Sequence, residues 1–178
     1  MRFTHTPLAG AFIIDIERLE DSRGFFARTY CNQEFEAHGI FHFPVQSNLS
    51  FNAMRGTLRG MHFQRPPHAE AKLVRCTAGR IFDVIVDIRE DSPTLHQWFG
   101  IELSNASRRA LYIPEGFAHG FQTLADASEV FYEMFNMFKP EYCGGLRWDD
   151  PLLGIKWPLE VVSISERDQS YPLLATQL

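Results

Sequence analysis

The chain has 178 residues and a net charge of −5, with a pI near 5.8. This length favours one domain with a sizeable core, and the acidic balance excludes a general nucleic-acid binder, which carries a basic face. The three cysteines include no CxxC pair, which argues against a disulfide framework and favours a reducing cytoplasm. The sequence shows no signal-like segment and no membrane-spanning apolar run, so we expect no membrane partner.

The first part of the chain predicts a turn and a short helix. The stretch "EDSRGFF" (residues 20–26) contains turn-forming residues and carries Arg23. Residues 31–39, "CNQEFEAHG", have acidic side chains early, Phe35 at the centre and Gly39 as a stop, which is typical of a short helix.

The middle of the chain predicts strands. Residues 80–90, "RIFDVIVDIRE", alternate in the way a half-buried strand does. The preceding "KLVRCT" predicts another strand, with a hairpin turn at residues 78–79 between the two. Further short strand candidates follow at roughly ten-residue spacing: "WFGIELS", "RALYIPE", "HGFQTLA" and "SEVFYEMFNM".

The last part predicts one more short helix, "SISERD", with Ser165 as its N-cap and Asp168 three residues later. No linker, repeat or low-complexity stretch divides the chain. We therefore expect one all-β domain over residues 1–178, a sandwich or barrel with a few short peripheral helices.

Two histidine motifs resemble those of the cupin barrel family. Gly56 is followed after five residues by His62, but Gln64 stands where a metal-binding cupin has its second histidine. The second motif, Pro-x-Gly-x-x-His, is complete and ends at His119. Two imidazoles and an amide make a poor zinc or iron site, so we expect no metal. His62 is then a base or a hydrogen-bonded core histidine.

Basic residues surround His62 in the sequence. Arg59 and Lys72 fall on strands expected to be adjacent, and Arg23 lies in the early turn. Cations that converge inside a barrel require an anion, and a diphosphate suits both arginine and lysine. The plain alternative is that each is a solvated surface side chain.

A closer resemblance covers residues 20 to 174. The motifs occur in one order: "RGFF", "QSNLS", "LRGMHFQ", "KLVR", "FDVIVDIR", "SPT", "YIPEGFAHGF", "LRWDDPLLGIKWP" and "PLL". This series resembles the dTDP-4-dehydrorhamnose 3,5-epimerase family, a cupin-type jelly roll that works without metal or other cofactor. So many motifs in register make a specific signal.

The resemblance implies a reaction on a nucleotide-linked 4-keto-6-deoxyhexose, most simply dTDP-4-dehydro-6-deoxyglucose converted to dTDP-4-dehydrorhamnose. A base removes a proton from C3 or C5, an enolate forms, and an acid returns a proton to the other face. His62 matches the base, Asp168 its partner and Tyr132 the acid. Lys72 matches the cation beside the enolate oxygen.

The resemblance also implies substrate contacts and a partner. Substrate-contacting positions are matched by Gln46, Asn48, Arg59 and His119, a nucleotide-side contact by Arg23, and a position usually lysine by Arg167. The family forms homodimers in which an N-terminal strand joins the partner's sheet. That would place Arg23 and Arg28 in the neighbouring subunit's site.

Three departures fall on ligand-recognition positions. Arg28 stands where a glutamate is usual, Phe138 replaces a tyrosine that stacks on thymine, and Cys143 replaces a substrate-binding glutamate. One reading is that the chemistry is retained on a CDP- or GDP-linked sugar, and the other is neutral drift with dTDP retained. Epimerisation at one carbon, a non-catalytic sugar-binding cupin and a metal-dependent cupin enzyme are further alternatives.

Overall fold

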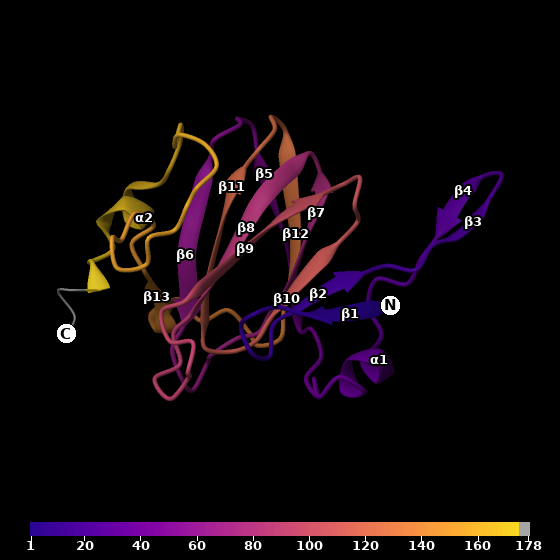
Figure 1. Ribbon diagram of the computed structural model, residues 1–178, viewed down its shortest axis with the longest axis horizontal. Coiled ribbons are helices and arrows are strands. Elements are labelled where there is room, and N and C mark those ends of the chain that lie inside the picture. Colours follow the sequence, from indigo (N-terminus) through magenta and orange to yellow (C-terminus); the bar gives the residue numbers. More distant parts are fainter. Residues whose placement is uncertain (175–178) are drawn as a thin grey trace.

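Period-two alternation gives most strands an inward apolar face, and these faces are buried between two antiparallel sheets (Figure 1). The computed structural model describes residues 1–174, and residues 175–178 of the expected domain lie outside the described part. The expected all-β jelly-roll class with short peripheral helices is confirmed.

The larger sheet has six strands, in spatial order β1 (Arg2–His5), β2 (Phe12–Asp15), β10 (Ala110–Ile113), β7 (Lys72–Ala78), β12 (Ser128–Met134) and β5 (Gln46–Asn52). The smaller sheet has five, in order β13 (Cys143–Gly145), β6 (Leu58–Gln64), β11 (Phe117–Thr123), β8 (Arg80–Asp87) and β9 (Trp98–Ser104). A separate ribbon pairs β3 (Leu19–Asp21) with β4 (Gly24–Phe26). The helical segments are α1 (Asn32–Glu36), α2 (Glu166–Ser170) and a 3₁₀ turn at Pro140–Tyr142.

The main core lies between the sheets. Val74 and Val130 of the larger sheet pack there with Ile81 and Ile85 of the smaller one. Two further clusters cover the outer faces. One surrounds Phe35 of α1, and the other places the C-terminal segment over β8.

Two strand-level expectations are wrong. The turn at residues 78–79 is not a hairpin, because β7 pairs with β10 and β12 while β8 pairs with β9 and β11. It carries the chain from one sheet to the other. β8 is also not half-buried, since the C-terminal segment covers its outer residues Val84 and Val86. The aspartates on its inner face are buried because they have polar partners there.

Both predicted helices are present. Phe35 of α1 is fully buried against Phe3, Tyr30 and Phe135. The Ser165 hydroxyl accepts a hydrogen bond from the Asp168 N–H at 3.1 Å, which is the expected N-cap of α2. Within the described residues, no helix has the length and apolar character to cross a membrane.

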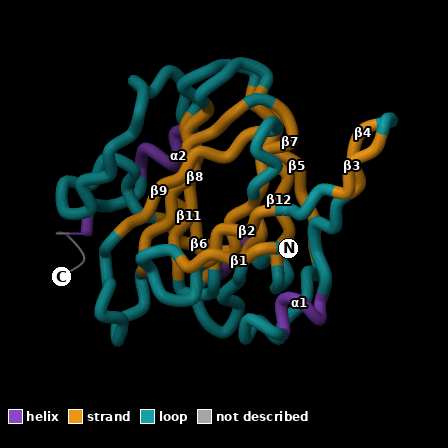
Figure 2. The backbone as a smooth tube through the Cα atoms, turned by 45° about the vertical axis from the view of Figure 1, so that its right-hand side comes forward, coloured by secondary structure: helices purple, strands orange, loops and turns teal. Residues whose placement is uncertain are grey.

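The β3–β4 ribbon holds Arg23 in its turn, as predicted, and stands away from the sandwich in both ribbon views (Figures 1 and 2). Its side chains Leu19 and Phe26 are 70% and 71% exposed. An isolated two-stranded ribbon with bare apolar side chains is marginal by itself in water.

Gly60 lets β6 and β11 approach closely. It has a φ of +130°, and a Cβ added there would lie 2.5 Å from the Cα of Gly120. The strand register of this pair also shifts between His119 and Phe121. The two glycines therefore fix how the two histidine-bearing strands meet.

We predict that Gly60→Ala lowers the free energy of unfolding by about 3 kcal/mol or more, through backbone strain and overpacking together. Gly39 provides the control, because its φ is +79° but no atom lies within 4 Å of a Cβ there. Gly39→Ala should cost only the left-handed backbone strain, about 1–2 kcal/mol. Urea denaturation measures the unfolding free energy of both variants. Equal losses would contradict the claim that the close approach of β6 and β11 requires a glycine at residue 60.

Candidate active site

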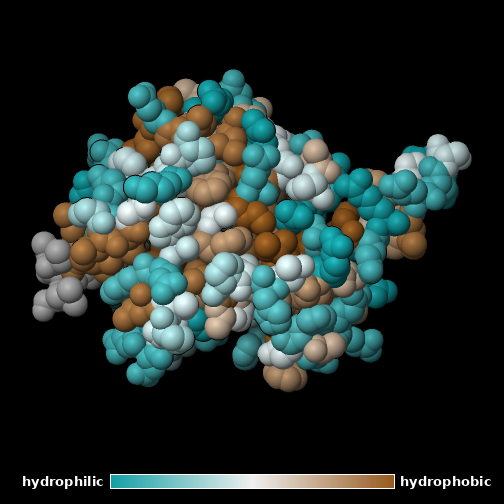
Figure 3. All heavy atoms as spheres, viewed as in Figure 1, coloured by the Kyte–Doolittle hydropathy of each residue, from teal (hydrophilic) through white to brown (hydrophobic). Residues whose placement is uncertain are grey.

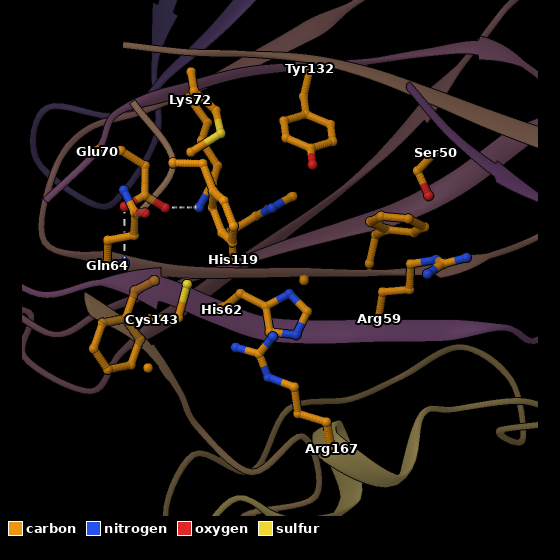
Figure 4. A pocket seen from close by; sticks show the side chains of 16 residues that line it. Ser50, Arg59, His62, Gln64, Glu70, Lys72, His119, Tyr132, Cys143 and Arg167 are labelled. Carbon is orange, nitrogen blue, oxygen red and sulfur yellow. Dashed lines mark hydrogen bonds and ion pairs between the residues drawn. The ribbon is translucent and has the colours of Figure 1, made fainter. Parts of the chain in front are cut away.

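A cavity of about 230 Å³ opens between the sheets and is lined from both of them. Eight of the predicted site residues line it: Arg59, His62, Lys72, His119, Tyr132, Phe138, Cys143 and Arg167. Figure 4 labels seven of these side chains, all except Phe138, and shows them converging on one space from β6, β7, β11, β12, β13 and α2. The structure thus brings these eight predicted residues together around one cavity.

His62 and Asp168 form a hydrogen-bonded pair across 106 positions of sequence. The imidazole Nε2 lies 2.7 Å from Asp168 Oδ1. The other carboxylate oxygen accepts the Gly60 N–H at 3.2 Å. Burial alone would raise the pKa of Asp168, but these hydrogen bonds, with the one at Ser165, bring it below the usual value. The carboxylate is therefore ionised at neutral pH.

The ionised Asp168 determines the tautomer of His62. A carboxylate only accepts, so Nε2 carries the proton that it donates to Asp168. In the neutral ring Nδ1 then holds a free lone pair. The side chain is 43% exposed, and its ring faces the cavity (Figure 4). This arrangement is that of a general base held by a carboxylate.

A second histidine–aspartate pair lies beside the first. His119 is directly opposite His62 in the β6–β11 register, and its Nε2 lies 2.8 Å from Asp83 Oδ1. Asp83 is fully buried on β8. The alternation of residues 80–90 does not reveal this role of Asp83. The signal in the sequence is an acidic residue flanked on both sides by apolar residues within a strand.

Lys72 enters the cavity from the opposite sheet. The expectation that Arg59 and Lys72 lie on adjacent strands is wrong, because β6 and β7 belong to different sheets. The Lys72 ammonium is buried and donates to Glu70 Oε1, while Glu70 Oε2 accepts the Gln64 N–H at 2.9 Å (Figure 4). The pairing lets a buried cation persist next to the cavity.

Tyr132 also enters from the larger sheet, on β12. Its hydroxyl points into the cavity from the wall that faces β6 (Figure 4). Burial raises the pKa of the Tyr132 phenol, and the nearby Arg59 guanidinium offsets only part of this rise. The phenol therefore keeps its proton at neutral pH and is available as a donor.

Other predicted residues lie around the rim. The Arg59 Nε donates to Asn52 at 2.7 Å, and the Arg167 Nε donates to the Tyr171 hydroxyl at 2.9 Å. The Cys143 thiol lines the same side as Arg167 (Figure 4). Two guanidinium groups thus lie at the rim with several donors left unused, which suits an anionic group.

Four predicted binding residues do not line the cavity of their own chain. Gln46 and Asn48 bond to each other at 3.0 Å on β5, where Asn48 is the register partner of Tyr132. Arg23 pairs with Asp21 on the ribbon, and Arg28 pairs with Glu34 at 2.8 Å. Both arginines are exposed, so their side chains are accessible to another molecule.

Several lining residues were not predicted as site residues: Ser50, Phe63, Gln64, Glu70, Phe121 and Met134. Strand periodicity could have predicted two of these as lining residues. Phe121 lies two residues after His119, and Met134 lies two residues after Tyr132, so each shares a face with its neighbour.

Among residues 1–174, no group of three or more His, Cys, Asp or Glu side chains is placed to hold a metal ion. The nitrogen atoms Nε2 of His62 and His119 each bond an aspartate, and the Gln64 side chain bonds backbone groups.

Comparisons with known proteins return one family of enzymes. The family model described as dTDP-4-dehydrorhamnose 3,5-epimerase matches residues 5–176. An enzyme of that name from Methanothermobacter thermautotrophicus is 47% identical, over 96% of this chain and 92% of its own. The crystal structure of the Elizabethkingia anophelis enzyme superposes with a TM-score of 0.96 at 38% identity, covering 99% and 98% of the two chains. A Legionella pneumophila 3,5-epimerase in complex with dTDP-4-keto-L-rhamnose gives a TM-score of 0.92 at 38% identity, covering 98% and 93%.

We predict that Asp168→Asn destabilises the protein by about 1–3 kcal/mol at pH 7, because it breaks a buried hydrogen-bond network. The pKa of folded Asp168 lies below its unfolded value, so the ionised group stabilises the fold above about pH 4 and loses this effect as pH falls through the folded pKa. The difference in free energy of unfolding between wild type and Asp168→Asn should therefore become smaller at acidic pH.

Asp149→Asn is the control, because Asp149 forms a partly exposed ion pair with Arg147. It should cost less than about 1 kcal/mol at any pH. Urea denaturation across the acidic range measures all three proteins. If the loss of unfolding free energy in Asp168→Asn stays constant down to pH 3, the claim that Asp168 is an ionised, stabilising carboxylate is contradicted.

Proposed function

The chain belongs to the dTDP-4-dehydrorhamnose 3,5-epimerase family, and on that premise we propose how its own residues epimerise a dTDP-linked 4-keto-6-deoxyhexose. One observation carries the proposal. A histidine base and a tyrosine acid enter one cavity from opposite sheets. Epimerisation removes a proton from one face of a carbon and returns one to the other, so it needs two groups on opposite sides.

His62 begins the reaction. The ketone at C4 makes the C3 and C5 protons acidic, and Nδ1 of His62 removes one of them. The imidazolium that forms is stabilised by Asp168 at 2.7 Å. The carbanion delocalises onto the ketone oxygen as an enolate.

Lys72 stabilises that enolate. A preorganised cation beside a developing oxyanion lowers the barrier without reorganisation at the moment of reaction. Glu70 holds the ammonium in place, and its second oxygen is anchored by the backbone of β6. His119, held by Asp83, lines the cavity on the wall that carries His62 and is placed to contact the sugar.

Tyr132 completes the inversion. Its phenol is protonated at neutral pH because burial raises its pKa. Donation from the wall opposite His62 delivers the proton to the other face of the enolate. The imidazolium of His62 then releases its proton to solvent and the Tyr132 phenolate regains one. Repetition at the second carbon gives the 3,5-epimer, and a single cycle gives epimerisation at one carbon only.

The nucleotide is proposed to bind along the rim. Arg59 and Arg167 suit the diphosphate, and Phe138 provides an aromatic face for the base. Gln46 and Asn48 lie on β5, beside Met134 and Tyr132 of β12. A relative with a dTDP sugar bound supports dTDP over CDP or GDP. Cys143 and Phe138 then represent drift that keeps the site's shape.

We also propose a homodimer in the cytoplasm. The ribbon exposes Leu19 and Phe26, and the edge strand β5 of the larger sheet exposes Leu49 and Phe51, all more than half exposed. Figure 3 shows brown apolar groups reaching the surface. Covering them with a second copy would carry Arg23 and Arg28 to the neighbour's cavity. The cysteines of the described residues are all unpaired, which suits a reducing compartment.

We predict that the wild-type enzyme, incubated in heavy water with dTDP-4-dehydro-6-deoxyglucose, incorporates deuterium at C3 and C5, as followed by NMR. His62→Ala should slow incorporation at both carbons at least about hundredfold, since the general base is gone. His42→Ala, an exposed histidine outside the cavity, should leave it unchanged.

Tyr132→Phe separates the two halves of the reaction. It should retain proton removal while slowing formation of the epimerised product. If deuterium exchange is undiminished in His62→Ala, His62 is not the base. Loss of exchange in Tyr132→Phe but not in His62→Ala would reverse the two roles. Parallel trials with CDP and GDP sugars test the choice of nucleotide.

Mixing two inactive variants tests the shared site. If Arg23 serves the partner's cavity, subunits carrying His62→Ala and Arg23→Ala should complement one another after co-refolding. One site in each heterodimer then holds an intact His62 and the partner's intact arginine. Random pairing gives about a quarter of wild-type activity. No recovery, despite heterodimers detected by differential tags, would place Arg23 outside the neighbouring site.

A further inference from the structure

Gln64 is a buried glutamine whose amide bonds entirely to backbone. Its Nε2 donates to the His68 carbonyl at 2.9 Å and to the Met137 carbonyl at 3.3 Å. Its Oε1 accepts the Lys139 N–H at 2.5 Å. Gln64 therefore holds the residues on both sides of Phe138.

These contacts require an amide. A glutamine offers two N–H donors and one carbonyl acceptor, and here both hydrogens and the oxygen are used. A histidine has one donor and one acceptor when neutral, so it would leave one backbone group unpaired. A glutamate would lose both donors. The amide at this position is thus explained by the three backbone groups it meets.

Phe138 depends on this support. Its ring is 46% exposed and lines the cavity, so side-chain packing alone does not fix it. Its N–H donates to the Gln46 Oε1 at 3.2 Å. Residues 137, 138 and 139 are therefore each held by a glutamine, two of them by Gln64.

We infer that Gln64 is a positioning residue that sets affinity for the nucleotide by holding Phe138 at the rim. This rests on the proposed function, in which Phe138 presents its face to the base. The His62–Asp168 pair and the Tyr132 phenol make no bond to the Gln64 side chain. The backbone N–H of Gln64 that holds Glu70 is unaffected by changing the side chain.

The test is Gln64→Met, which keeps the volume and removes all three bonds. We expect Kd for dTDP and KM for the sugar nucleotide to rise about threefold to tenfold, because this is the change in affinity that the loss of one aromatic contact causes. We expect kcat to stay within about twofold of the wild-type value. Calorimetry measures Kd, and the rate of epimerised product formation at varied substrate concentration gives kcat and KM.

Gln122→Met is the matched control. Gln122 is equally buried and brackets Leu159 through both ends of its amide, at 2.9 and 3.0 Å, but it does not line the cavity. It should lose similar stability and leave Kd for dTDP unchanged. An equal rise in Kd in both variants would mean general loosening and would overturn the inference.

A double variant shows whether Gln64 acts through Phe138. Phe138→Ala should raise Kd, and adding Gln64→Met should raise it no further. Additive effects would overturn the inference, as would an unchanged Kd in Gln64→Met. If Gln64→Met does not fold, Gln64→His keeps one donor and one acceptor and should show a smaller rise in Kd, and no rise would count against the inference. A wild type that binds dTDP but shows no exchange defeats the proposed function instead.

Discussion

The hydrogen bond between His62 and Asp168 is the interaction on which the site depends. It joins β6 of the smaller sheet to α2 near the end of the described chain, over 2.7 Å. Ser165 caps α2 and so holds Asp168, while Gly60 gives β6 the backbone N–H that meets the second carboxylate oxygen. The proposed acid–base chemistry thus requires the C-terminal segment to pack on the outer face of the sandwich, where Figure 1 shows it.

The two-sheet fold then supplies what epimerisation needs. One wall carries two histidines, each backed by an aspartate, and the other carries Lys72 and Tyr132. A metal-binding cupin gathers its ligands on a metal ion, whereas here Asp168 takes one nitrogen of His62 and Gln64 is committed to the backbone around Phe138. In the proposed mechanism, catalysis and nucleotide recognition therefore depend on different residues of β6, His62 and Gln64.

Much of this was predictable from the sequence. Period-two alternation located most of the strands, and capping signals located α1 and α2, because both are local properties. Pairing is not local, so the turn at residues 78–79 was read as a hairpin and Arg59 and Lys72 as neighbours. The resemblance to a known family predicts that His62, Tyr132 and Asp168, which are far apart in the sequence, belong to one site. It did not reveal Asp83 or the bonds of Gln64, because a buried polar side chain is explained only by its spatial partners.

The tautomer of His62 is the most direct test of the account. Long-range ¹H–¹⁵N NMR of labelled protein above neutral pH distinguishes a proton on Nε2 from one on Nδ1. We predict Nε2–H in the wild type, with Nδ1 as the free base, and a mixture of tautomers in Asp168→Asn. A wild-type His62 protonated on Nδ1 would turn a donor toward the cavity and contradict its role as the base.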